Sequence, residues 1–105
     1  MNVISDEMKK ISDIITQHYQ VEKIYLFGSY ARGTEYHDSD IDICILIDNN
    51  DKKLQIIRNV RKALYDNISK PVDLLVYKPQ EFYERAASLK SIEREIIDEG
   101  VALYG

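Results

Sequence analysis

The stretch GSYARGTEYHDSDIDICILI, residues 28 to 47, decides the fold prediction. Its second half, DIDICILI, indicates a β-strand from Asp40 to Ile47, because successive side chains of a strand point to opposite faces. Isoleucines at positions 41, 43, 45 and 47 share one face, and the other face carries Asp40, Asp42, Cys44 and Leu46. We therefore expect both faces to be covered, except at the end that bears the two aspartates.

Two more strands are predicted on either side of this one. KIYLFG at 23 to 28 is short, aromatic and β-branched, and it stops at a glycine, which is typical of a buried strand that ends in a turn. PVDLLVY at 71 to 77 is the third strand, and a proline does least damage at a strand's first position. Asp73 is then expected near the start of that strand.

Helices are predicted between and around the strands. Ser5 is a plausible N-cap for an amphipathic helix over 5 to 19 that covers the sheet, and Asn49, Asn50 and Asp51 form a turn and cap before a helix that runs to about Asn67. The apolar stripe of this second helix is expected to include Leu54, Ile57, Val60 or Arg61, and Leu64. One or two helices over 79 to 100, ending at Gly100, carry Phe82, Ala86, Leu89, Ile92, Ile96 and Ile97. The element order predicts an α/β (α+β) fold in which helices pack on a small sheet.

Length and composition restrict the class of protein. With 105 residues the chain fits one domain, 1–105, which is too small for a catalytic domain plus a substrate domain, so another molecule is expected to complete the substrate site. We find neither a membrane span nor a signal peptide, and we expect a cytoplasmic protein with no membrane partner. A net charge of -4 argues against long nucleic acids as direct partners.

Several reactive side chains have plainer interpretations. Cys44 lies inside an apolar run, so we expect a buried thiol. His37 is expected in a polar surface loop. Tyr25, Tyr65 and Tyr77 occur in apolar patterns, and we expect them to pack at the edge of the core.

The two aspartates two positions apart are the strongest chemical signal. On a strand, Asp40 and Asp42 project from the same face, where two ionised carboxylates repel each other unless a cation lies between them. Oxygen ligands without a histidine or cysteine cluster favour Mg²⁺, with Mn²⁺ as the alternative. If the strand over 71 to 77 pairs beside this one, Asp73 completes a site for two metal ions and can accept a proton from the attacking group.

The first half of the opening stretch suits a phosphate group. Gly28 permits close approach of the backbone, Ser29 offers a hydroxyl, and the N–H groups that open SYARG can surround an anion. Arg32 can add positive charge against the phosphates. The alternative is structural, with Ser29 capping the turn and Arg32 pairing with Glu35 or Asp38.

GS after a strand, then DSDIDI, then VDLL on a third strand, resembles the nucleotidyltransferase superfamily that includes DNA polymerase beta and kanamycin nucleotidyltransferase. In a chain this short, GSYARG followed by DSDIDI is similar to the minimal nucleotidyltransferases of bacteria and archaea. The resemblance implies a mixed sheet flanked by helices and ATP as substrate. It places phosphate binding on Gly28 and Ser29, and metal binding and catalysis on Asp40, Asp42 and Asp73.

The resemblance also implies a partner. Minimal nucleotidyltransferases of the MntA antitoxin type act beside a small helical HEPN-domain ribonuclease toxin, so the chain is expected to transfer AMP from ATP to a tyrosine hydroxyl of that toxin. Two alternatives remain open. The chain could neutralise its toxin by binding alone, or it could modify a small molecule, for which a chain this short leaves little room.

Overall fold

The computed structural model describes residues 5–35 and 39–105, and nothing is said of the structure of the rest. Five helices and four strands are defined in these residues. They follow one another as α1 (Asp6–His18), β1 (Lys23–Phe27), α2 (Ser29–Arg32), β2 (Ile41–Leu46), α3 (Lys53–Tyr65), β3 (Val72–Tyr77), α4 (Pro79–Ala86), α5 (Ile92–Glu99) and β4 (Val101–Tyr104). The three predicted strands and the predicted helices are confirmed, with small shifts at their ends.

The strands form one mixed sheet in the order β3-β2-β1-β4. β1 is antiparallel to both of its neighbours, β2 and β4, whereas β2 and β3 run parallel. The parallel pair requires a crossover, which α3 provides. The mixed α/β fold is therefore confirmed, and β3 lies at an edge of the sheet. β4 was not predicted, because the sequence analysis assigned no element after the helix end at Gly100.

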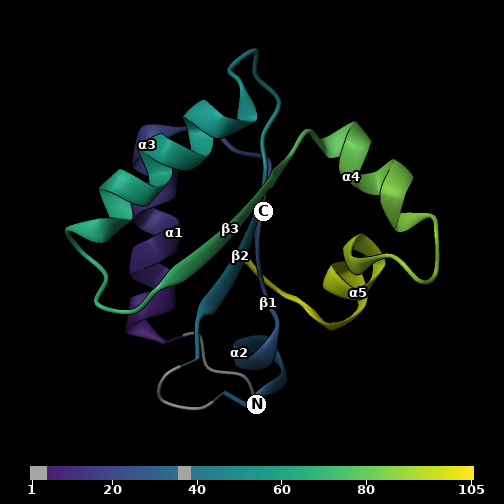
Figure 1. Ribbon diagram of the computed structural model, residues 1–105, viewed down its shortest axis with the longest axis horizontal. Coiled ribbons are helices and arrows are strands. Elements are labelled where there is room, and N and C mark those ends of the chain that lie inside the picture. Colours follow the sequence, from purple (N-terminus) through teal and green to yellow (C-terminus); the bar gives the residue numbers. More distant parts are fainter. Residues whose placement is uncertain (1–4, 36–38) are drawn as a thin grey trace.

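Helices cover both faces of the sheet. Figure 1 shows α1 and α3 on one side of the strands and α4 and α5 on the other. The larger core lies under α1 and α3, and it contains the isoleucines at 41, 43, 45 and 47. The smaller core lies under α4 and α5 around Phe82, and it contains Cys44, Leu46 and Tyr77. The predicted alternation along β2 thus separates two cores.

α1 follows its prediction closely. The Ser5 side chain accepts a hydrogen bond from the Met8 backbone N–H at 3.2 Å and so caps the helix. Ile11 and Ile15 are fully buried against the sheet. A helix that begins at a satisfied cap and buries one stripe is held in place at its start and along its length.

α3 corrects part of the predicted stripe. Its buried residues are Ile56, Val60 and Leu64, whereas Leu54 is 71% exposed. Leu54 precedes Ile56 by two residues, which is about 200° around a helix, so one of the two must face solvent. The helix also begins after Lys52, which has no side-chain cap, so the predicted cap at 49 to 51 is wrong.

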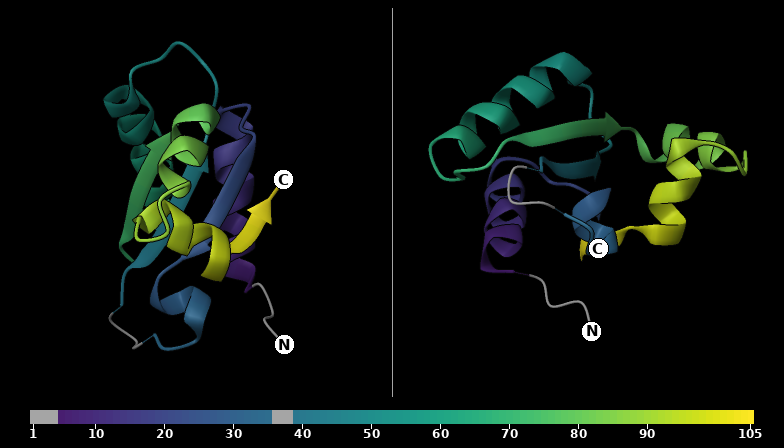
Figure 2. Two further views of the ribbon diagram at one scale, coloured as in Figure 1. Left: turned by 90° about the vertical axis from the view of Figure 1, so that its right-hand side faces the viewer. Right: turned by 60° about the horizontal axis from the view of Figure 1, so that its bottom comes forward.

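Three other apolar residues of the predicted helices are also exposed. Tyr65 at the end of α3 is 84% exposed, in contrast to Tyr25 and Tyr77, which are buried as expected. Leu89, in the turn between α4 and α5, is 80% exposed, and Ile92, the first residue of α5, is 47% exposed. Figure 2 shows this turn at the margin of the molecule. In the described residues, no helix is long and apolar enough to cross a membrane.

Candidate active site

Asp42 and Asp73 are brought together by the parallel pairing of β2 and β3. They are direct register partners, and on its other side Asp42 lies opposite Phe27 of β1. Because side chains alternate, both aspartates lie on the face where Cys44 and Tyr77 pack, which is the face covered by α4 and α5. The sequence-based condition for Asp73, that its strand pairs beside β2, is confirmed.

Gly28 brings the backbone against the Asp42 carboxyl group. It directly follows β1 and has a φ of 74°, a left-handed value that favours glycine. A Cβ atom built on Gly28 would lie 2.1 Å from Asp42 Oδ2, which is far inside van der Waals contact. The absence of a side chain at this position is therefore a steric requirement for the Asp42 carboxyl group.

The charges around Asp42 are unbalanced. Partial burial raises the pKa of Asp42, and the negative charges of Asp73 and Asp40 raise it further, while Arg32 has a smaller opposite effect. Asp40 and Asp73 are exposed, whereas Asp42 is half-buried between them. The charges of Asp40 and Asp73 thus both act on Asp42, which lies near the start of β2 beside β3.

The donor set fits a hard divalent cation. It consists of carboxylates, and the raised pKa of Asp42 indicates negative charge that a cation would neutralise. In residues 5–35 and 39–105, no three carboxylate, imidazole or thiol groups are close enough to form a ready-made metal cluster. Mutual repulsion is the expected behaviour of such acids without a cation.

α2 presents the predicted phosphate-binding residues beside these acids. The helix comprises Ser29–Arg32, and the backbone carbonyl of Ser29 accepts the Thr34 N–H at 2.9 Å, which closes the turn. Arg32 is exposed and forms an ion pair with Glu95 of α5 at 3.9 Å. Among the described residues it forms no ion pair with Glu35, one of the two predicted partners. Asp38 and His37 lie outside the described residues.

Two acidic residues of α5 were not singled out from the sequence. Glu95 reaches Arg32 only through the packing of α5. Glu93 is buried, and the Tyr77 hydroxyl donates a hydrogen bond to it at 2.5 Å, which ties α5 to β3. The alternation from Asp73 to Tyr77 could have placed Tyr77 on the aspartate face, but α5 carries no signal for its partner.

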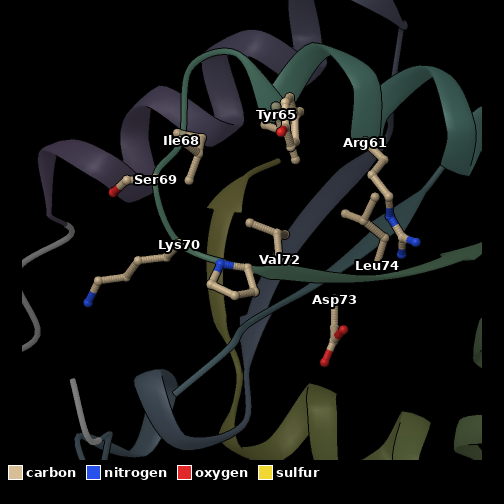
Figure 3. A pocket seen from close by; sticks show the side chains of 10 residues that line it. Arg61, Tyr65, Ile68, Ser69, Lys70, Val72, Asp73 and Leu74 are labelled. Carbon is tan, nitrogen blue, oxygen red and sulfur yellow. The ribbon is translucent and has the colours of Figure 1, made fainter. Parts of the chain in front are cut away.

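A separate groove runs between α3 and β3 at the edge of the sheet. It has a volume of about 670 Å³, and Asp73 lies at its margin. In Figure 3 the Asp73 side chain points away from the labelled side chains of α3. The groove and the acidic site are thus on opposite faces of the same edge strand.

Comparison with known proteins identifies the family. Residues 9–105 match the family described as "Polymerase beta, Nucleotidyltransferase", and the chain belongs to it. The chain is therefore a nucleotidyltransferase by family, as the resemblance implied. It is 33% identical over 102 residues to a Methanocaldococcus jannaschii protein provisionally named a protein adenylyltransferase, with 92% of this chain and 95% of the relative covered.

Solved structures show the same fold. One, described as a toxin-antitoxin with AMP-PNP, has a TM-score of 0.71 at 24% identity and covers 96% of this chain and 74% of that chain. Another, described as a tri-AMPylated Shewanella oneidensis HEPN toxin in complex with an MNT antitoxin, has a TM-score of 0.57 at 21% identity and covers 94% of this chain and 70% of the other. The fold that the resemblance implied, a mixed sheet flanked by helices, is therefore shared with these structures.

Proposed function

We propose that this chain is a Mg²⁺-dependent protein adenylyltransferase that transfers AMP from ATP to a tyrosine hydroxyl of a HEPN-domain toxin and so acts as its antitoxin. The register pair Asp42 and Asp73, with Asp40 coupled to it, carries the proposal. The relative named as a protein adenylyltransferase is matched over 95% of its length, which supports a protein acceptor. The fold shared with chains of toxin-antitoxin complexes supports the kind of partner.

The proposed reaction is a displacement at the α-phosphorus of ATP. The tyrosine oxygen forms the new bond to phosphorus, the bond from the α-phosphorus to the bridging oxygen breaks, and pyrophosphate leaves. Asp73, on the edge strand, takes the proton of the attacking hydroxyl and releases it to solvent. Divalent cations held by Asp40, Asp42 and Asp73 would supply charge neutralisation at the phosphates and lower the pKa of the attacking hydroxyl.

The triphosphate is assigned to the α2 side of the aspartates. Gly28 and Ser29 open this turn, so the backbone N–H groups and the Ser29 hydroxyl are available to phosphate oxygens. Arg32 is the cation within electrostatic range of Asp42, and its exposed ion pair with Glu95 is weak enough to exchange for a phosphate. The nucleotide and the acceptor would then approach Asp42 from opposite sides, from β1 and from β3.

The consequence for the toxin follows from charge and size. An AMP group on a tyrosine adds a phosphate charge and a nucleoside to a surface that must bind RNA. Like charge and bulk both oppose binding of the RNA backbone. A modified toxin is therefore expected to lose its ribonuclease activity.

Intact-mass measurement of the toxin tests the proposal. The purified HEPN-domain protein is incubated with this chain and Mg-ATP, and its mass is expected to rise by whole AMP units, with peptide mapping to a tyrosine. The double variant Asp40→Asn, Asp42→Asn should abolish the gain. Asp48→Asn with Asp51→Asn is the matched control, because both acids are exposed and lie beyond the end of β2.

The two alternatives give different results in the same experiment. An unmodified toxin that is still inhibited by the Asp40, Asp42 double variant would establish neutralisation by binding alone. Transfer of AMP to a small hydroxyl compound, with the toxin mass unchanged, would establish a small-molecule enzyme. Either outcome would refute the proposed function.

A further inference from the structure

The groove between α3 and β3 has the features of a binding surface, and it lies on the opposite face of β3 from the acidic site. Its walls include the apolar side chains of Leu64, Ile68 and Leu74, and its rim carries Arg61, Tyr65 and Lys70. In Figure 3 Arg61 extends from α3 toward the strand and Tyr65 lies at α3, both on the side of the strand opposite to the Asp73 carboxylate. An apolar floor with a charged and aromatic rim is typical of a surface that binds a polypeptide.

The exposed face of α3 continues this surface. Leu54, Arg58, Arg61 and Tyr65 follow one another at spacings of four, three and four residues, which places them on one helix face. Leu54 is 71% and Tyr65 84% exposed, and both arginines are exposed. In the described residues, neither Arg58 nor Arg61 forms an ion pair. Two unpaired cations and two exposed apolar side chains on one helix face indicate a surface that awaits a partner.

The charge of this region is opposite to that of the whole chain. Residues 52–70 contain six basic residues and one acidic residue, a net charge of +5, whereas the full chain has a net charge of -4. The remaining residues therefore carry -9. Such concentration of positive charge on one helix and its following loop selects a negatively charged partner by long-range attraction.

The groove is also on the route to the proposed proton acceptor. β3 is an edge strand, so beyond it no further strand of the sheet separates the groove from the face that bears Asp73. A polypeptide seated in the groove needs to pass over only one strand to present a hydroxyl to Asp73, a step that one or two residues can span. The nucleotide would occupy the other side of Asp42, beside α2.

We propose that the α3 face and the α3–β3 groove, defined by Leu54, Arg58, Arg61, Tyr65 and Lys70, form the docking surface for the acceptor protein. This inference rests on the proposed function. The occupant is an acidic polypeptide segment with apolar residues, which lies beside the tyrosine to be modified. A protein is favoured over RNA because the groove walls are mainly apolar and because the rest of the chain is strongly negative.

Charge reversal on α3 tests the docking surface. The variant Arg58→Glu, Arg61→Glu is compared with Lys9→Glu, Lys10→Glu on α1, which changes the net charge equally at exposed positions away from the groove. For the α3 variant we expect the KM for the HEPN-domain protein to rise about tenfold or more, with kcat at saturating acceptor and the KM for ATP nearly unchanged. The α1 variant should behave as the wild type. Tyr65→Ala tests the aromatic part of the rim without changing charge.

Binding measured without ATP separates this inference from the proposed function. In calorimetry with the HEPN-domain protein, the α3 variant should bind about tenfold more weakly than the α1 variant, and the wild-type affinity should fall as salt is added. Equal affinity of the two variants would refute the docking surface, even if AMP transfer occurs. A loss that is confined to binding of a single-stranded RNA oligonucleotide would also refute it and would assign the surface to nucleic acid. Absence of transfer by the wild type, with the α3 variant still weaker in binding, would refute only the proposed reaction.

Discussion

Asp42 of β2 and Asp73 of β3 are direct partners in a parallel strand pair, which places two carboxylates from distant parts of the chain on one face of the sheet. Parallel register partners have side chains on the same face, so this proximity is a property of the backbone pairing rather than of flexible loops. Its electrostatic consequence is the raised pKa of Asp42, to which burial contributes most. The folded protein therefore holds the Asp42 carboxylate beside a like charge, at a position fixed by strand pairing.

Asp42→Asn is expected to stabilise the metal-free protein at neutral pH. The raised pKa means that the stabilising contribution of Asp42 is fully present below its unfolded value of 3.8 and is lost as pH rises through the folded pKa. The stability advantage of the variant over the wild type should therefore grow from acid to neutral pH. Because Asp42 is only partly buried and solvent screens its charge, we expect less than about 1 kcal/mol at pH 7, measured by thermal unfolding with a chelator.

Adding Mg²⁺ should reverse this order. The wild type gains stability by binding the cation in its folded state, whereas the variant lacks a ligand and gains little. Asp13→Asn on α1 is the control, because Asp13 is exposed and distant from the acids along the fold. If Asp42→Asn is less stable than the wild type in chelator across the whole pH range, the electrostatic interpretation of this site is wrong.

Gly28→Ala is expected to damage both stability and activity. The added Cβ atom would lie 2.1 Å from Asp42 Oδ2, and the φ of 74° is unfavourable for alanine. Displacement of the Asp42 carboxyl group by even about 1 Å should reduce AMP transfer by about a hundredfold.

Gly33→Ala separates the two effects of that change. Gly33 has nearly the same φ, 73°, but a Cβ atom there meets nothing within 4 Å. It should lose about 1–2 kcal/mol in urea unfolding from the backbone conformation alone, and it should keep its activity. Equal activities of the two alanine variants would exclude steric support of Asp42 by Gly28.

The strand that carries the acids was predictable because its pattern is local. Alternation of isoleucine along residues 40 to 47 determined which face Asp42 occupies, and the structure confirms it. The pairing of β2 with β3 joins segments far apart in the sequence. The sequence alone could therefore not show that Asp73 lies beside Asp42. The strand pattern proposed Asp73 on the condition that the two strands pair, the family resemblance implied the same residue, and the register places it opposite Asp42.

Other features depend on tertiary packing that no short pattern contains. β4 has four residues, and it pairs with β1, which lies far earlier in the chain. The ion pair between Arg32 and Glu95 joins α2 to α5 and requires the α4–α5 hairpin to be folded. Leu54 was assigned to the buried stripe of α3, because its spacing to Ile57 and Leu64 also fits one helix face. The structure instead buries the face that carries Ile56, Val60 and Leu64.

Cys44 is expected to be unreactive in the folded protein. It is fully buried, and burial, assisted by the charge of Glu93, raises the pKa of the thiol to about 12. Since the thiolate is the reactive form, alkylation by iodoacetamide at pH 8, followed by mass spectrometry, should proceed only as fast as the protein unfolds. A variant with Cys44→Ala and Lys9→Cys provides an exposed thiol as control, and fast alkylation of native Cys44 would contradict its burial.

Tyr77→Phe is expected to destabilise the protein through Glu93. The Tyr77 hydroxyl donates a 2.5 Å hydrogen bond to the buried Glu93 carboxyl group, and phenylalanine would leave that group without this donor. Loss of one partner in a buried pair with a charged group lowers the free energy of unfolding by about 1–3 kcal/mol, measured in urea at neutral pH. The raised pKa of Tyr77, caused mainly by burial, means that its contribution to stability is present below the ordinary tyrosine pKa of 10.0 and is lost as pH rises further. The wild type should therefore lose stability more steeply than the variant above pH 10.0.

Glu93→Gln is the matched control, because an amide oxygen still accepts from Tyr77. Its loss should be the smaller of the two, and a larger loss in Glu93→Gln than in Tyr77→Phe would show that the carboxylate is stabilised by a group other than Tyr77.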